Sequence, residues 1–95
     1  MNSTYPFNVN FIEDLTDISK RTIQSTTAEL VKIVPFFAYK NEKGEWRYNK
    51  KSVQTFCLID VRIVKNDTEM SKYKALELVY GVPVEFSLAI AQKER

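Results

Sequence analysis

The sequence has no histidine, a single cysteine and only two glycines in 95 residues. Without histidine the chain lacks the commonest general base and the commonest metal ligand. One cysteine builds neither an internal disulfide nor a zinc site of the usual kind. Gly44 and Gly81 stand far apart, so no glycine-rich loop is available to cradle a phosphate. We therefore expect a protein that is not an enzyme and that holds no metal or cofactor.

Long hydrophobic runs are also missing. No stretch approaches the roughly 18 apolar residues of a membrane span, and residues 1–25 lack the basic start and apolar stretch of a signal peptide. With Cys57 as the only cysteine, we expect a reduced, cytoplasmic setting. Apolar content of 44% and charged content of 27% are ordinary for a globular protein. The length predicts one domain over residues 1–95, with loose ends at 1–6 and 93–95.

The net charge is only +2, but it is distributed unevenly. Residues 1–31 carry a net charge of −2, whereas residues 32–51 carry six basic and two acidic side chains, a net charge of +4. Aromatic residues fall in the same stretch, from Phe36 to Tyr48. Rings that stack on unpaired bases, beside cations that contact phosphates, are typical of a groove for single-stranded nucleic acid. A protein interface can have the same composition.

Hydrophobic patterning predicts mostly strands. From Val53 to Val64 the odd positions form an almost wholly apolar face, which is the period of a half-buried strand. Apolar residues at even positions from Leu76 to Ile90 predict two more strands, or one sharply bent strand, because Gly81 and Pro83 interrupt the run. The segment 29–39 is apolar on both faces and predicts a central strand.

Three shorter segments complete this interpretation. Asn41 to Gly44 supplies the turn residues of a hairpin loop, and Asn66 to Thr68 can cap a short helix over residues 69–74. The N-terminal region is ambiguous, because Phe7 to Phe11 alternates as a strand while Phe11, Leu15 and Ile18 recur at helical spacing.

The resulting order of elements is that of a five-stranded OB barrel, and the chain resembles the bacterial single-stranded-DNA-binding protein family over about residues 8–82. The family's first strand typically ends in a Leu-x-x-Asp turn with an arginine beyond it. Its second strand leads into an aromatic residue, a basic residue and a Gly-Glu hairpin, and its fourth strand often ends in Val-Tyr. The matching residues here are 10–17 with Arg21, then Tyr39, Lys40 and 44–46, then the third strand at 53–61, and finally 72–81.

The resemblance implies an all-β fold, a five-stranded OB-type barrel with one short helix between strands three and four. It also implies that residues 7–11 form a strand. Family members stack bases on aromatic residues of the second and third strands, and Tyr39 matches one such position. The third-strand positions hold Val53 or Gln54 and Ile59 instead of rings, and no acidic tail like the family's precedes Arg95. Self-association is a further expectation, because members of the family commonly form tetramers.

We therefore expect a non-catalytic accessory protein of DNA replication or recombination that contacts single-stranded DNA. Bases would stack on Tyr39, Trp46 and Phe56, and cations on the hairpin would contact phosphates. An alternative for Phe56 is that the N-terminal segment covers it. The full set of candidate residues is Tyr39, Lys40, Trp46, Arg47, Tyr48, Lys50, Lys51 and Phe56. The alternative function is a protein-binding OB module of a phage or mobile element, which docks on a polymerase, primase or helicase and binds little DNA itself.

Overall fold

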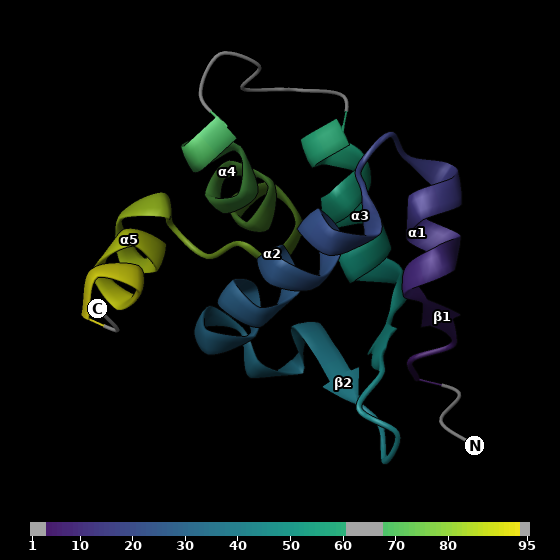
Figure 1. Cartoon of the computed structure of the whole chain (residues 1–95). Helices are drawn as coiled ribbons and strands as arrows, with labels where there is room; N and C mark the ends of the chain where they lie inside the picture. The colour runs from purple at the N-terminus through teal and green to yellow at the C-terminus, as the bar shows by residue number, and fades with distance from the viewer. Residues whose placement is uncertain (1–3, 61–67, 94–95) are drawn as a thin grey trace.

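Helices dominate the computed structural model, which describes residues 4–60 and 68–93 (Figure 1). The expected all-β, five-stranded OB barrel is wrong, because this part of the chain forms five α-helices and one three-stranded sheet. The elements in chain order are β1 (Phe7–Asn8), α1 (Val9–Leu15), α2 (Lys20–Ile33), the 3-10 turn η1 (Pro35–Phe37), β2 (Ala38–Lys40), β3 (Trp46–Tyr48), α3 (Lys50–Asp60), α4 (Thr68–Tyr80) and α5 (Val84–Lys93).

The sheet is antiparallel with the strand order β1-β3-β2, so β3 is its central strand. Tyr48 on β3 lies opposite Phe7 on one side and Ala38 on the other. The predicted hairpin is confirmed: the Asn41 N–H donates to the Glu45 carbonyl at 2.9 Å across the loop between β2 and β3. Gly44 takes a φ of 78° there, a conformation that glycine adopts without a steric penalty.

Three of the helices begin at an asparagine or serine whose side chain satisfies a free backbone N–H. Asn8 caps α1 and Ser19 caps α2, each by accepting from the N–H three residues on, at 2.9 and 3.3 Å. At α3 the bonds are reciprocal, since Asn49 Oδ1 accepts from the Ser52 N–H and Ser52 Oγ accepts from the Asn49 N–H, both at 2.9 Å. Such reciprocal caps fix where a helix starts.

The largest correction concerns residues 53–64, which the alternation predicts as a strand. Residues 50–60 form α3, and residues 61–64 lie outside the described part of the chain. Val53 and Phe56 lie one turn apart on the buried face of this helix, while Gln54 is exposed. The Thr55 hydroxyl donates to the Lys51 carbonyl at 2.8 Å, so a β-branched polar residue is accommodated within the helix. The apolar run fits the period of a strand and that of a helix. The reciprocal cap of Asn49 and Ser52 at its start favours the helix.

The two strands expected between Leu76 and Ile90 are also helices, α4 and α5. Leu76 is fully buried, whereas Leu78 is 57% exposed, because two residues along a helix turn the side chain by about 200°. Gly81 ends α4 with a φ of 75° and donates its N–H to the Glu77 carbonyl at 2.9 Å. The short helix expected over 69–74 is therefore part of the longer α4.

Two N-terminal expectations are corrected in the same way. The central strand expected over residues 29–39 is a strand only from Ala38, because α2 continues to Ile33 and Pro35 opens the 3-10 turn η1. The strand expected over residues 7–11 ends at Asn8, whose side chain starts α1. The N-terminal region thus contains both a short strand, β1, and a short helix, α1, which are the two alternatives that its sequence leaves open.

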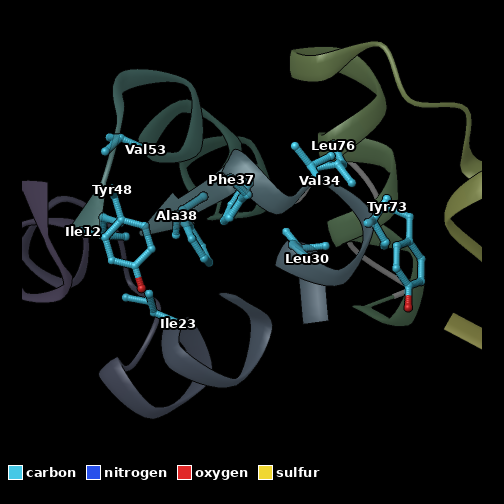
Figure 2. Close-up of a cluster of buried hydrophobic side chains, with 12 residues drawn as sticks. Ile12, Ile23, Leu30, Val34, Phe37, Ala38, Tyr48, Val53, Tyr73 and Leu76 are labelled. Atoms are coloured by element: carbon cyan, nitrogen blue, oxygen red, sulfur yellow. The ribbon is translucent and has the colours of Figure 1, made fainter. Parts of the chain in front are cut away.

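The core lies between α2, the sheet, α3 and α4, and α5 packs against α2 and α4 (Figure 1). Tyr48 is fully buried at its centre, and Figure 2 shows its hydroxyl pointing toward Ile23 on α2. The Thr27 hydroxyl donates to the Ile23 carbonyl at 2.7 Å and lies 2.9 Å from the Tyr48 hydroxyl. Because the single proton of Thr27 is used by that carbonyl, Tyr48 donates to Thr27. The fully buried apolar side chains are Ile12, Ile23, Leu30, Phe37, Tyr48, Phe56 and Leu76.

A double-mutant cycle will test this hydrogen bond. Thr27→Val leaves the buried Tyr48 hydroxyl without an acceptor, so we expect the free energy of unfolding to fall by about 1–3 kcal/mol. Tyr48→Phe removes the hydroxyl itself, so no buried donor is left without an acceptor. We expect this variant to lower the free energy of unfolding by about 0.5–1.5 kcal/mol. Urea unfolding of both single variants and the double variant should give a summed loss larger than that of the double variant. Strict additivity would contradict the bond.

Alkaline pH should destabilise the fold through the same residue. Burial raises the pKa of Tyr48 to about 12, although the hydrogen bond with Thr27 lowers it. The folded-state pKa is above the ordinary value of 10.0, so the stabilisation is complete below about pH 10 and is lost as the pH rises toward about 12. Urea unfolding at about pH 9 and about pH 11.5 should show this loss, and Tyr48→Phe should make it smaller. An equal loss in the variant would exclude Tyr48 as a source.

Candidate nucleic-acid interface

A rigid turn of four residues, Thr16–Ser19, joins α1 to α2. The Thr16 hydroxyl donates to the Ile12 carbonyl at 2.8 Å and accepts from the Ile18 N–H at 3.2 Å. Ile18 is half-buried and packs against the hydrophobic core, which anchors the turn from below. These contacts fix the direction in which α2 leaves α1. We refer to Val9–Ile33 as the helix–turn–helix unit.

The start of α2 is held by side chains from three elements. Ser19 caps the helix, and Glu13 on α1 accepts from the Lys20 N–H at 3.0 Å. The Asp17 N–H donates to the Asp60 carboxylate at the end of α3, at 2.9 Å. The two carboxylates satisfy backbone donors at and just before the positive end of the helix dipole, where negative charge is favourable.

One face of α2 is open to solvent along its first three turns. The buried face carries Ile23, Thr27 and Leu30. Residues 20–28 contain no acidic residue, and Glu29 lies beyond them and forms an ion pair with Lys72 on α4 at 2.8 Å. The exposed side chains, at spacings that place them on one face, are Lys20, Arg21, Gln24, Ser25 and Ala28.

The hairpin of β2 and β3 lies beside this face. A polar recess of about 280 Å³ separates them. It is lined by Asn8, Val9 and Asn10 at the start of α1, by Lys20 and Gln24 from α2, and by Gly44, Glu45, Trp46 and Arg47 from the hairpin, so it holds one acid beside its cations. Lys40 covers the half-buried Trp46, with its Nζ 5.1 Å from the centre of the indole ring. The first turns of α2 and one face of the hairpin therefore form a continuous polar surface with several cations.

Two residues predicted to contact nucleic acid are in the core instead. Tyr48 is 0% exposed and Phe56 is 1% exposed, so neither ring has a face open to a base. Tyr48 faces α2 from the central strand, and the rings of Tyr48 and Phe56 pack edge to face at a centroid distance of 6.0 Å. Phe56 also packs against Phe37 at 5.8 Å. Other core residues, and not the N-terminal segment, account for these contacts of Phe56.

Arg47, predicted to hold phosphate, is hydrogen-bonded to the backbone of the N-terminal segment. Its Nη2 donates to the Pro6 carbonyl at 2.9 Å and its Nε donates to the Tyr5 carbonyl at 3.4 Å. The guanidinium therefore ties residues 5 and 6 to the sheet. Residues 1–6 are expected from the sequence to be a loose end, and only residues 4–6 of them belong to the described part of the chain. Within that part, Tyr5 and Pro6 are held by the hydrogen bonds from Arg47.

The remaining predicted residues are accessible but lie on different surfaces. Tyr39, Lys40, Lys50 and Lys51 are exposed. Tyr39 pairs with Arg47 and Lys40 pairs with Trp46, and successive residues of a strand point to opposite faces. Tyr39 and Lys40 therefore lie on opposite faces of the hairpin. The structure does not gather the predicted residues into one groove.

The sequence interpretation missed the open face of α2. Its most prominent polar residues are Lys20, Arg21 and Gln24, which the pattern-based prediction assigned no role. A signal was present at Ser19, because a serine before a polar turn and a helically spaced apolar series is typical of a helix start. Recognising that start would have indicated two helices separated by a short turn.

A second hollow, of about 550 Å³, is apolar and lies between α1, α3 and α4. Phe11, Leu15 and Leu78 line it and remain substantially exposed. Cys57 also lines it, where burial and the nearby Asp60 carboxylate raise the pKa of the thiol. Because the thiolate is the reactive form, Cys57 is a poor nucleophile at neutral pH.

Comparison with known proteins gives no family assignment: no family model, curated protein or solved structure matches the chain. In the described residues, no three metal-binding side chains of the histidine, cysteine or carboxylate type gather at one place. None of the helices within 4–60 and 68–93 has both the length and the apolar character needed to cross a membrane. Function must therefore be argued from the geometry.

Proposed function

We propose that the protein binds duplex DNA without catalysis, through its helix–turn–helix unit. The observation that carries this proposal is the open, acid-free face of α2 over residues 20–28, presented by a turn that side-chain hydrogen bonds and core packing hold fixed. Two helices joined by a short turn are a recurrent DNA-binding motif, in which the second helix enters the major groove. That groove is about 12 Å wide and admits one α-helix.

The residue types on this face suit base recognition. Arginine can bond guanine through two donors, and glutamine can bond adenine in the same way, so Arg21 and Gln24 are the candidates for reading bases. Ser25 can donate or accept, and the short side chain of Ala28 allows the helix axis to approach the groove floor. All four are exposed on α2. The N-terminal part of such a helix is the part that contacts base edges.

The hairpin supplies cations for the phosphates beside the groove. Lys43 lies in its exposed loop, Lys40 on the face toward the recess, and Lys20 at the start of α2. Phosphate contacts of this kind position a protein on DNA without reading sequence. Because only a few cations are involved and Glu42 and Glu45 flank Lys43, binding is expected to be modest, with a salt dependence set by a small number of phosphate contacts.

This proposal replaces the role that the OB fold implied. The surface formed by α2 and the hairpin is shaped by a convex helix, which fits a groove, whereas an OB barrel would offer a concave strand-binding channel. A reduced, cytoplasmic setting, as the single cysteine indicates, remains part of the proposal.

Selection from a pool of random duplexes at low salt, followed by anisotropy measurements on the enriched sequence, tests the function. Gln24→Ala should weaken binding to that duplex by about 1–3 kcal/mol and relax the preference at one or two base pairs. Lys20→Gln should weaken all duplexes similarly and reduce the salt dependence.

Matched controls are available on α5, where Gln92 and Lys93 are also exposed. Gln92→Ala and Lys93→Gln should bind like the unchanged protein. The proposal would be rejected if no sequence were enriched, or if Gln24→Ala and Gln92→Ala bound the duplex equally well.

A further inference from the structure

A stripe of aromatic rings lies on the other face of the hairpin, opposite the recess. We call Tyr5, Phe36, Tyr39 and Tyr80 the ring stripe. The ring centroids of Tyr5 and Tyr39 are 5.8 Å apart, and those of Phe36 and Tyr80 are 5.9 Å apart. The Tyr5 hydroxyl donates to the Phe36 carbonyl at 3.1 Å, which joins the two pairs into one row. Three segments distant in sequence, at residue 5, residues 36–39 and residue 80, thus contribute to one surface.

The stripe is held in place from below and yet is open to solvent. Phe36 is 62% exposed and Tyr39 is 43% exposed. The Phe36 carbonyl accepts a second hydrogen bond from Asn49 Nδ2 at 3.3 Å, and Asn49 Oδ1 accepts from the Tyr80 hydroxyl at 3.4 Å. Because Asn49 also caps α3, the rings are attached to a helix start. Burying Phe37 in the same 3-10 turn directs Phe36 outward.

Several cations lie near these rings, in stretches of the chain that contain no acid. Residues 30–41 contribute Phe36 and Tyr39, and residues 46–59 contribute Lys50 and Lys51. Neither stretch contains an aspartate or a glutamate. Lys51 places its Nζ 5.5 Å from the centre of the Tyr80 ring, and Lys50 precedes it on the exposed start of α3. The Arg47 guanidinium donates to the backbone carbonyl of Tyr5. The nearest acids along the chain are Glu42 in the hairpin loop, three residues after Tyr39, and Glu77 on α4, which lies three residues before Tyr80 and forms an ion pair with Lys74.

We propose that the ring stripe is a second binding site, for an unpaired nucleic-acid strand. Exposed flat rings offer stacking faces, and a polyanion is the ligand that an acid-free row of cations favours. Duplex DNA does not meet this description, because its bases are already stacked and present only their edges. Bases would stack on Phe36 and Tyr39, and phosphates would follow Lys50 and Lys51. The site does not depend on the proposed function of α2.

The test measures anisotropy of labelled oligo-dT and oligo-U, each about 12 nucleotides long, at low and at moderate salt. Phe36→Ala and Tyr39→Ala should each weaken binding by about 5- to 150-fold, the equivalent of 1–3 kcal/mol per stacked base. Lys51→Gln should reduce the salt dependence. Equal binding of both strands would assign the site to single-stranded nucleic acid in general, and preference for one would show which of the two strands the site favours; either result supports the proposal.

Phe86→Ala is the matched control, since Phe86 on α5 is 53% exposed and lies outside the stripe. It should bind both strands like the unchanged protein. Because Phe36 and Tyr39 are exposed, their variants should keep the unfolding temperature close to that of Phe86→Ala, which separates lost binding from lost folding.

Gln24→Ala should leave strand binding unchanged, so failure of the duplex proposal and failure of this one can be told apart. Absence of strand binding below about 10 μM even at low salt would overturn the second site, since electrostatic binding is strongest there. Equal strand binding by Phe36→Ala, Tyr39→Ala and Phe86→Ala would also overturn it.

Discussion

The hydrogen bond between Tyr48 and Thr27 links the two parts of the molecule on which everything else depends. Tyr48 lies in the central strand of the sheet, and Thr27 lies on the buried face of α2. Its geometry fixes the distance between the hairpin and the helix, while the surrounding apolar side chains supply most of the stabilisation. A buried polar pair of this kind is costly when incomplete, so it favours one arrangement over others with similar apolar packing.

Both candidate surfaces follow from that arrangement. Trp46 and Lys40 point from the hairpin toward the recess beside α2, and Tyr39 points from the opposite face toward Tyr5. The strand pleat alone decides which residue serves which surface, because neighbouring positions face opposite ways. A one-residue slip of β2 against β3 would exchange the two sets and would also remove Ala38 from its place opposite Tyr48.

The sequence allowed local features to be predicted more reliably than the fold. The hairpin at Asn41 to Gly44 is determined by its own residues, and it is present as predicted. Residues 53–60 were open to two interpretations, because β-branched and apolar side chains fill both a strand period and a helix period. The reciprocal cap of Asn49 and Ser52 decides between them, and it is a pattern of two residues three apart that composition does not reveal. The resemblance to a strand-binding family rested on similarly short motifs, and the fold that it implied is not the one observed.

Among the candidate site residues, chemistry could be predicted but not position. The enrichment of rings and cations between residues 32 and 51 is a property of the sequence. Whether a ring is buried like Tyr48 or exposed like Tyr39 depends on contacts with α2 and with residue 5, which are distant along the chain. The open face of α2 depends on the four-residue turn that precedes this helix. A prediction that treats this part of the chain as strands includes no such turn.

The pairing of β1 with β3 has a consequence for the order of events during synthesis. Phe7 pairs with Tyr48, so the first strand of the chain must wait for about forty further residues to leave the ribosome before its partner exists. Within the helix–turn–helix unit, the contacts between α1 and α2 are local in sequence and can form during that interval. Its orienting contact with the sheet comes later, when residues 46–48 emerge and dock. The helix–turn–helix unit would thus acquire its final geometry only in the second half of translation.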